Sequence, residues 1–181
     1  IGGGTGLSTM LKGLKLHTHN ITAVVTVADD GGSSGILRSD LGMLAPGDVR
    51  NCVSALAEVD PVMGELLNFR FKDGSLKGHS LGNLFLAALN ETSSSFDEAV
   101  KKFSHLAGVV GTVYPVTNES VTLSALLEDG RLIEGESHIG VHHDGPKNGI
   151  VKLMVNPEKP KAVDGVIKAL EKADIIVLGP G

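Results

Sequence analysis

The stretch Ile1–Asp30, IGGGTGLSTMLKGLKLHTHNITAVVTVADD, decides the fold class. After its glycines, apolar residues recur with the spacing of one helix face, at Leu7, Met10, Leu11 and Leu14. Ile21–Val27 is a short apolar run, which is typical of a strand buried on both faces. A glycine turn followed by a helix and a strand is part of a βαβ unit. The sequence therefore predicts an α/β fold with a parallel sheet and right-handed crossovers.

Both ends of the chain indicate that the sequence continues beyond them. The glycine turn Gly2–Gly6 needs a strand before it, and we expect Ile1 to be the tail of that strand. The run Asp174–Leu178 is expected to form a last buried strand that leads into a turn at Gly179–Gly181. We therefore expect residues 1–181 to form a single domain, truncated at both ends.

Further helices and strands are indicated along the rest of the chain. Helices are expected at Asp48–Leu56, opened by an acidic cap, at Pro61–Phe69, from His79 or Ser80 onward, after a capping box of Ser95 and Glu98, and at Val163–Lys172. Strands are expected at 109–116, 121–127 and Ile150–Val155. The turn Asp129-Gly130 predicts an antiparallel hairpin added to the parallel sheet. The loop Gly140–Gly149 is expected to be the mobile segment.

Composition limits the class of function. The net charge is −5 with scattered lysines, so no electrostatic footprint for DNA or RNA is present. The 24 glycines, against one tyrosine and no tryptophan, favour backbone-lined loops over stacking platforms. The single cysteine, Cys52, suits a reducing compartment, and no run approaches the ~20 apolar residues of a membrane helix. We expect a cytoplasmic protein that neither binds nucleic acid nor inserts into a membrane.

Three glycine-rich loops are expected at one edge of the sheet: Gly2–Gly6, Asp29–Gly35 and Gly179–Gly181. Loops that follow parallel strands gather where open α/β proteins hold ligands, and the first loop also leads into a helix N-terminus that favours anions. The dinucleotide pattern G-x-G-x-x-G fails at Leu7 or at Thr9, and the Walker pattern fails too. A phosphate group is therefore expected without a nicotinamide or flavin cofactor. Tight strand-to-helix packing is the alternative reading of the first loop.

The acidic loop indicates a metal-bound diphosphate. Asp29 and Asp30 follow the strand directly, and further polar groups lie on adjoining turns at Arg38, Asp40, Asp48, Arg50, Asn51, His79, Ser80 and Asn83. Carboxylate oxygens beside arginines suit Mg²⁺ and phosphate oxygens. Asp30 and Asp48 are the expected metal ligands. The alternative for the paired aspartates is an Asx turn with helix capping.

Three other patterns give weaker predictions of a functional site. Gly31–Gly35 matches the G-x-S-x-G motif with Ser33 as nucleophile, but two aspartates before the turn oppose an oxyanion. His138, His142, His143 and Asp144 suggest zinc, although their glycine-rich surroundings favour a solvated loop. Cys52 lies on the apolar side of its helix and is expected to belong to the core.

Several motifs in order carry a family resemblance. They are GGGTGLS (Gly2–Ser8), VTVADDGGSSGILR (Val25–Arg38), PGDVRN (Pro46–Asn51), HSLGNL (His79–Leu84) and the terminal GPG (Gly179–Gly181). Together they closely resemble the gluconeogenesis-factor (YvcK-like) branch of the CofD superfamily. The resemblance implies a Rossmann-like three-layer sandwich and a cytoplasmic protein that binds a UDP-sugar or another nucleoside diphosphate. It also implies a role in cell shape and wall synthesis during gluconeogenic growth, cell-wall synthesis proteins as partners, and a homodimer.

The resemblance also implies a set of site residues. The expected phosphate- and ligand-binding residues are Gly2, Gly3, Gly4, Thr5, Gly6, Asp29, Asp30, Gly31, Gly32, Ser33, Ser34, Arg38, Arg50, Asn51, His79, Asn83, Gly179 and Gly181. The metal, Mg²⁺, is expected at Asp30 and Asp48, and no catalytic residue is assigned. The superfamily's other branch contains 2-phospho-L-lactate transferases, which use a guanosine diphosphate donor and Mg²⁺. Those enzymes have a Gly-Asp-Asp turn, whereas Ala28 precedes the pair here. Transferase chemistry therefore remains the alternative function.

Overall fold

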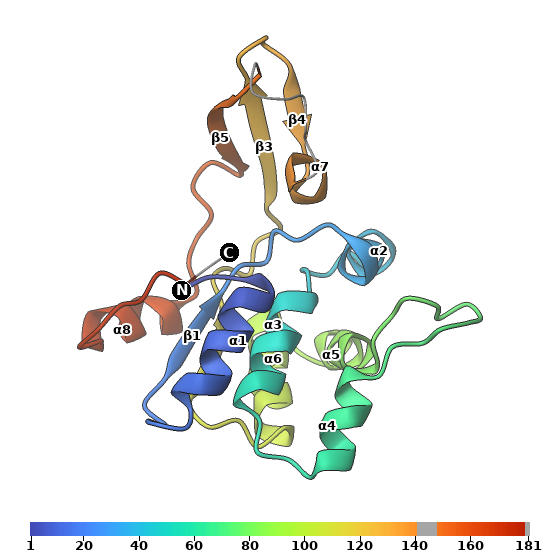
Figure 1. Ribbon diagram of the computed structural model, residues 1–181, viewed down its shortest axis with the longest axis vertical. Helices are drawn as coiled ribbons and strands as arrows, with labels where there is room; N and C mark the ends of the chain where they lie inside the picture. Colours follow the sequence, from blue (N-terminus) through green and yellow to red (C-terminus); the bar gives the residue numbers. More distant parts are fainter. Residues whose placement is uncertain (141–147, 180–181) are drawn as a thin grey trace.

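The computed structural model of the chain describes residues 1–140 and 148–179. Figure 1 shows a body of helices around a short sheet, from which an arm of strands projects at one end. The start of the chain lies at the side of the body, below the arm, and Gly179 lies next to Ile1. The predicted α/β fold with a parallel sheet and an antiparallel addition is confirmed.

The parallel sheet is built around β1 (Thr22–Val25), which pairs with β2 (Thr112–Pro115). On the other side of β1, Gly2 forms a parallel bridge with Val25. Ile1 in turn donates its terminal N–H to Val177 O at 2.8 Å and accepts from Gly179 N at 2.7 Å. Ile1 and Gly2 therefore occupy a strand position between β1 and the end of the described chain.

Helices cover both faces of this sheet, as a three-layer arrangement requires. One face carries α1 (Gly4–Leu14), α3 (Gly47–Leu56) and α6 (Phe96–Leu106), and these helices contribute most of the main core. The other face carries α8 (Asp164–Lys172), whose Val166 packs with Val24 of β1. Buried β-branched residues of β1 separate the two layers, because alternate side chains of a strand point to opposite faces.

Two helices stand beside this layer. α4 (Pro61–Asn68) begins after Asp60, whose side chain accepts the N–H of Val62 at 2.9 Å. α5 (Leu81–Glu91) is capped by Ser80, which accepts the N–H of Asn83 at 3.2 Å, so the predicted start is confirmed. Cys52 is buried in the main core, as predicted.

The arm consists of β3 (Thr122–Leu127), β4 (Leu132–Glu134), α7 (Glu136–Gly140) and β5 (Ile150–Asn156). β3 is the central strand and pairs antiparallel with both neighbours, in the order β4-β3-β5. The predicted hairpin is confirmed, with Gly130 at φ 85° in the turn. Such a φ favours glycine because it has no Cβ.

Several sequence-based expectations need correction. The loop predicted up to Gly35 is instead the first turn of α2 (Gly32–Leu41), and the helix α7 was not predicted. α2 lacks strong helix-forming residues at its start, but burial of Ser33, Ser34 and Leu37 fixes it against the body. The strand expected at 109–116 begins only at Thr112, since Gly111 turns the chain at φ 91°.

The last strand and the start of α3 also differ from what the sequence predicts. The last strand was predicted to be buried, but Leu178 is 79% exposed and Ile175–Leu178 is not a β-strand, since among residues 1–140 and 148–179 it hydrogen-bonds only to Ile1. α3 was predicted to be capped by an acidic residue, yet its N-cap is Pro46 and no side chain caps it. Within the described residues, no helix has the length and apolar character needed to cross a membrane.

Candidate functional site

The first glycine turn and the loop after β1 line one cavity of about 520 Å³, here called the glycine-loop cavity. One wall consists of Gly2, Gly3, Gly4, Thr26, Val27, Ala28, Asp29 and Asp48. The rest of the lining consists of Val116, Thr117, Val121, Leu123, Glu136, Val155 and Pro160. The cavity therefore lies at the C-terminal ends of two neighbouring parallel strands, at the junction between the body and the arm. This is the position where open α/β sheets accommodate ligands.

Gly3 is the point of closest approach in this wall. A Cβ at Gly3 would contact Thr26 Oγ1 and would lie 2.7 Å from Asp48 Oδ2. Glycine is needed here for space, because the backbone of Gly3 is extended, with φ −153°. Any side chain at this position would push Thr26 and Asp48 apart and reduce the cavity.

Asp48 projects from the first turn of α3 to the start of α1, where its carboxylate lies beside the backbone N–H of Gly4. Burial and the neighbouring Asp29 raise the pKa of Asp48, and the bonds from Gly4 and Thr26 offset only part of this effect. The carboxylate of Asp48 therefore already lies at the N-terminus of α1, where the sequence predicts a phosphate. An N–H donor and the helix dipole favour that negative charge.

Carboxylates from three different elements face this cavity. Asp29 lies against the start of α3, because a Cβ at Gly47 would be 3.3 Å from its Oδ2. Burial, followed by the charges of Asp29, Asp30 and Asp48, raises the pKa of Glu136 at the start of α7. Across 1–140 and 148–179, however, no three histidine, cysteine or acidic residues lie close enough to hold a metal by themselves.

Asp30 points away from the cavity and towards the arm. Its Oδ1 accepts the N–H of Ser137 at 2.8 Å, and its Oδ2 lies against Gly135. Burial alone would raise the pKa of Asp30, but the hydrogen bonds from Ser137 outweigh it and the pKa is lowered. The structure thus places Asp29, rather than Asp30, beside Asp48, and Asp30 connects the acidic loop to α7.

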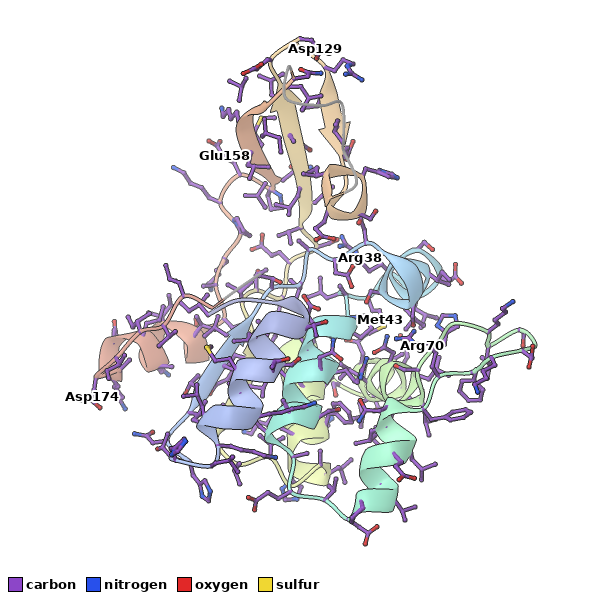
Figure 2. The ribbon with its side chains drawn as sticks, in the orientation of Figure 1. Arg38, Met43, Arg70, Asp129, Glu158 and Asp174 are labelled. Carbon is purple, nitrogen blue, oxygen red and sulfur yellow. The ribbon has the colours of Figure 1, made fainter. Side chains whose placement is uncertain are left out.

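Arg38 holds the acidic loop in place by hydrogen bonds to backbone carbonyl oxygens. Its Nη1 donates to Ala28 O and Asp29 O, both at 3.1 Å, and its Nη2 donates to Val121 O at 2.8 Å. Figure 2 shows Arg38, a residue of α2, at the base of the arm. The guanidinium that was expected to contact phosphate therefore joins the loop after β1 to the start of β3.

A second group of predicted residues forms a buried polar cluster away from the cavity lining. Ser33 Oγ lies 3.0 Å from His79 Nδ1 and accepts from Asn83 Nδ2 at 3.1 Å. Arg50 donates through Nε to Asn83 Oδ1 at 3.3 Å and through Nη1 to Asn68 Oδ1 at 2.8 Å. Burial lowers the pKa of Arg50. These contacts join α2, α3, α4 and α5 at one point.

The Ser33–His79 contact has the spacing of a nucleophile and its base, but not the access. Ser33 is only 8% exposed and His79 only 7% exposed. Neither residue lines the glycine-loop cavity. Ser33 also has an ordinary helical position, because no described residue other than glycine has a positive φ. The strained turn of a nucleophile elbow is therefore missing from this part of the chain.

The remaining predicted residues lie at the edges of these two groups. Ser34 Oγ accepts the N–H of Gly47 at 3.2 Å and thereby connects α2 to α3. Gly31 donates its N–H to Asp29 Oδ1 at 2.9 Å, which is the Asx turn weighed as an alternative. Thr5 is exposed, and Gly6 and Asn51 are half-buried. Gly179 pairs with Ile1, and Gly181 lies outside the described residues.

His138 lies in α7, and its Nδ1 is 2.8 Å from Glu134 O. The other members of the proposed zinc group, His142, His143 and Asp144, lie outside the described residues, as does most of the loop Gly140–Gly149.

Sequence reasoning did not find Thr26 and Glu136. Thr26 could have been found, because it directly precedes the acidic loop and a hydroxyl in an apolar strand is a polar signal. Glu136 gave no local signal, since the arm brings it to the cavity from more than a hundred residues further along the chain.

The fold and the site define a Rossmann-like α/β protein with an acidic, glycine-lined cavity at the ends of parallel strands. The family model described as "2-phospho-L-lactate transferase CofD" matches residues 1–181, and the chain belongs to this CofD family.

Curated relatives and a solved structure support this placement. A Thermoanaerobacterium thermosulfurigenes protein named "Putative gluconeogenesis factor" is 56% identical over 181 residues, which are 100% of this chain and 56% of the relative. The "Gluconeogenesis factor" of Bacillus subtilis is 46% identical over 99% of this chain and 56% of its own length. A crystal structure of a UPF0052 family member from Bacillus halodurans matches with a TM-score of 0.93 at 44% identity, over 99% of this chain and 56% of that one. The chain thus spans little more than half of these relatives.

Proposed function

We propose that the chain binds the diphosphate of a nucleotide sugar, such as UDP-N-acetylglucosamine, in the glycine-loop cavity. The observation that carries the proposal is that the glycine turn and the acidic loop converge on one cavity of about 520 Å³. A volume of this size lies within the range of about 300–1,000 Å³ that small-molecule sites occupy. The backbone of Gly2–Gly4 allows a ligand to approach closely, and Gly3 has no side chain to obstruct it.

A divalent cation is part of this proposal because the cavity is acidic. Its described lining contains Asp29, Asp48 and Glu136 but no lysine, arginine or histidine. A bare diphosphate would be repelled by these carboxylates. Mg²⁺ usually takes one or two carboxylates together with phosphate oxygens and water, rather than a full set of protein ligands. Asp29 and Asp48 are the pair whose positions suit such a shared site, and Asp30 would support the loop.

The alternative function is the transfer of a phospholactyl group from a guanosine diphosphate donor to a deazaflavin precursor. The description of the matching family as 2-phospho-L-lactate transferase favours this candidate. It would use the same cavity and metal. Formation of product from the donor, acceptor and Mg²⁺ decides for transfer, and binding of nucleotide sugar without turnover decides for the first proposal.

The cellular setting is proposed on the relatives' names and on the motifs described above. Two relatives carry the name of a gluconeogenesis factor, and we extend that role to this chain. In this proposal the protein is a cytoplasmic homodimer. It acts on cell shape and wall synthesis through partner proteins. Gel filtration with light scattering tests the dimer, and a growth assay on gluconeogenic carbon sources tests the role.

Calorimetry tests the binding proposal. Titration with UDP-N-acetylglucosamine is expected to give heat in the presence of Mg²⁺ and to lose most of it in EDTA, because the carboxylates then repel the phosphates. Asp29→Asn should weaken the Mg²⁺-dependent part by about tenfold or more. Asp40→Asn, on the exposed surface of α2, is the matched control and should leave binding unchanged. Equal binding by Asp29→Asn and the unchanged protein would count against the site.

The serine hydrolase alternative has its own test. A fluorophosphonate probe is expected to leave Ser33 unlabelled in the folded chain, because the hydroxyl is buried and bonded to His79 and Asn83. Labelling that disappears in Ser33→Ala would restore the hydrolase reading.

A further inference from the structure

The strand β5 of the arm has one open edge. Within residues 1–140 and 148–179 it pairs with β3, and no described strand lies on its other side. Figure 1 shows β5 at one side of the arm, which projects from the body. Apolar side chains are nevertheless exposed along this strand, since Val151 is 62% and Leu153 is 61% exposed. An edge of this kind is a surface on which another strand can pair.

The hydrogen bonds of β3 determine which backbone groups of β5 point to the open edge. Gly135 N donates to Leu123 O at 2.8 Å, so the odd-numbered residues of β3 bond to β4 and the even-numbered ones bond to β5. Over Lys152–Asn156, the register pairs these even-numbered residues with even-numbered residues of β5. The N–H and C=O groups of Leu153 and Val155 therefore point away from β3, to the open edge.

The regular part of this edge is short and symmetric about Met154. On one side, the register between β3 and β5 shifts beyond Lys152. On the other side, Pro157 has no N–H to donate. Bulges and prolines limit the pairing of an edge strand. The edge that can accept a new strand is therefore Lys152–Asn156, with Met154 at its centre.

An identical strand fits this edge. In an antiparallel pair centred on Met154, Leu153 of one copy lies opposite Val155 of the other, and the two residues exchange both backbone hydrogen bonds. Their apolar side chains then become neighbours on one face of the sheet. Lys152, the only charged residue of β5, lies opposite the neutral Asn156, so no like charges meet. The backbone groups, the apolar side chains and the charge of β5 thus all suit pairing with itself.

This pairing also closes after two copies. It joins the two three-stranded arms into one continuous sheet, whose outer strands are the two copies of β4. β4 has only three residues, Leu132–Glu134, and α7 follows it at Glu136–Gly140. Very short edge strands resist further pairing. A two-fold contact through β5 therefore gives a dimer and not a fibre.

We infer that β5 is the dimer interface of this protein, formed by antiparallel pairing of Lys152–Asn156 with the same residues of a second copy. The inference rests on the homodimer proposed above and does not depend on nucleotide binding. Pairing covers part of the apolar surface that Val151 and Leu153 expose. The interface lies next to the candidate site, because the strand residue Val155 also lines the glycine-loop cavity.

Charge substitutions at Met154 test the pairing by sedimentation equilibrium. The unchanged chain is expected to dimerise in the micromolar range. Met154→Lys and Met154→Glu should each weaken the dimer by about tenfold or more, because the same charge then lies opposite itself. An equal mixture of the two variants should dimerise again, since lysine then lies opposite glutamate.

The matched controls are Leu132→Lys and Leu132→Glu. Leu132 is 60% exposed on β4, on the same face of the arm's sheet as Met154 but away from the β5 edge. Both variants should dimerise like the unchanged chain. Hydrogen exchange by NMR on the unchanged chain should show the amides of Leu153 and Val155 protected in the dimer and exchanging faster on dilution. This measurement decides even where a Met154 variant fails to fold.

The outcomes separate this inference from the proposals above. A chain that stays monomeric overturns both the inference and the homodimer. The inference alone is overturned by a dimer that persists in Met154→Lys, that the mixed variants do not restore, or that the Leu132 variants weaken equally. Unprotected amides at Leu153 and Val155 in the dimer overturn it as well. Nucleotide binding is measured separately by calorimetry.

Discussion

Asp48, in the first turn of α3, holds its carboxylate beside the backbone N–H of Gly4, the residue that begins α1, and this N–H favours the charged form of Asp48. One residue earlier, Gly3 leaves just enough room for this contact. The glycine turn is thus built to receive a carboxylate from within the chain. Ligand phosphates would then meet a surface that already holds negative charge, which is why the account depends on a cation.

Replacing Gly3 with alanine tests the close approach. The added Cβ would collide with Thr26 and Asp48, so we expect unfolding in urea to show a loss of about 1–3 kcal/mol, and Mg²⁺-dependent nucleotide binding to disappear. Gly13→Ala, inside the helix α1 that Gly3 precedes, is the matched control. No atom lies within 4 Å of its Cβ position, so this variant should gain about 0.5–1 kcal/mol and bind normally.

Asp48→Asn tests the charge at the turn through its pH dependence. The folded-state pKa of Asp48 is raised, so its protonated form is favoured by folding. That contribution is fully present below the unfolded value near 3.8 and is lost as the pH rises through the higher folded pKa. Asparagine, which stays neutral and can still accept from Gly4, should therefore be the more stable form at neutral pH.

Thermal melts from acid to neutral pH are the measurement for Asp48→Asn. The variant should melt progressively higher than the unchanged protein as the pH rises, while losing Mg²⁺-dependent binding. A variant that is equally destabilised at every pH would show that the charge of Asp48 is not the cause.

Arg38→Met tests the bracing of the acidic loop. It removes charge-assisted bonds to Ala28 O, Asp29 O and Val121 O while keeping the aliphatic bulk. We expect a loss of about 2–3 kcal/mol in denaturant unfolding, together with faster amide exchange in the acidic loop. If Arg38 instead contacted only the ligand, stability of the free protein would not change and only binding would fall.

Asn83→Ala tests the buried polar cluster. Asn83 is 2% exposed and supplies partners to both Ser33 and Arg50, so its removal leaves buried polar groups unpaired. The expected cost is about 2–4 kcal/mol, with nucleotide affinity of the folded fraction nearly unchanged. Loss of affinity without loss of stability would place this cluster at the ligand instead.

Local patterns predicted the fold well where side chains repeat. The spacing of Leu7 and Leu11 predicted α1 and the run around Val24 predicted β1, because burial of one face dominates such segments. α2 was missed because its first residues are glycine and serine. Its stability comes from contacts such as Ser34 with Gly47, which no window of sequence contains.

The site was predictable as a region but not as a set of contacts. The acidic loop and glycine turn could be placed on one sheet edge from topology alone. Topology alone could not predict which aspartate faces the cavity. Asp30 faces away because it accepts a hydrogen bond from Ser137, a residue of the distant arm. The role of Arg38 likewise depends on Val121, and that pairing exists only after β3 has folded.

The most direct measurement is a crystal soaked with UDP-N-acetylglucosamine and Mn²⁺, with Mn²⁺ located by its anomalous signal. We expect a single peak beside Asp29 and Asp48, with the diphosphate against Gly2–Gly4. Anomalous density at Asp30 alone, or a nucleotide bound away from the glycine-loop cavity, would contradict it.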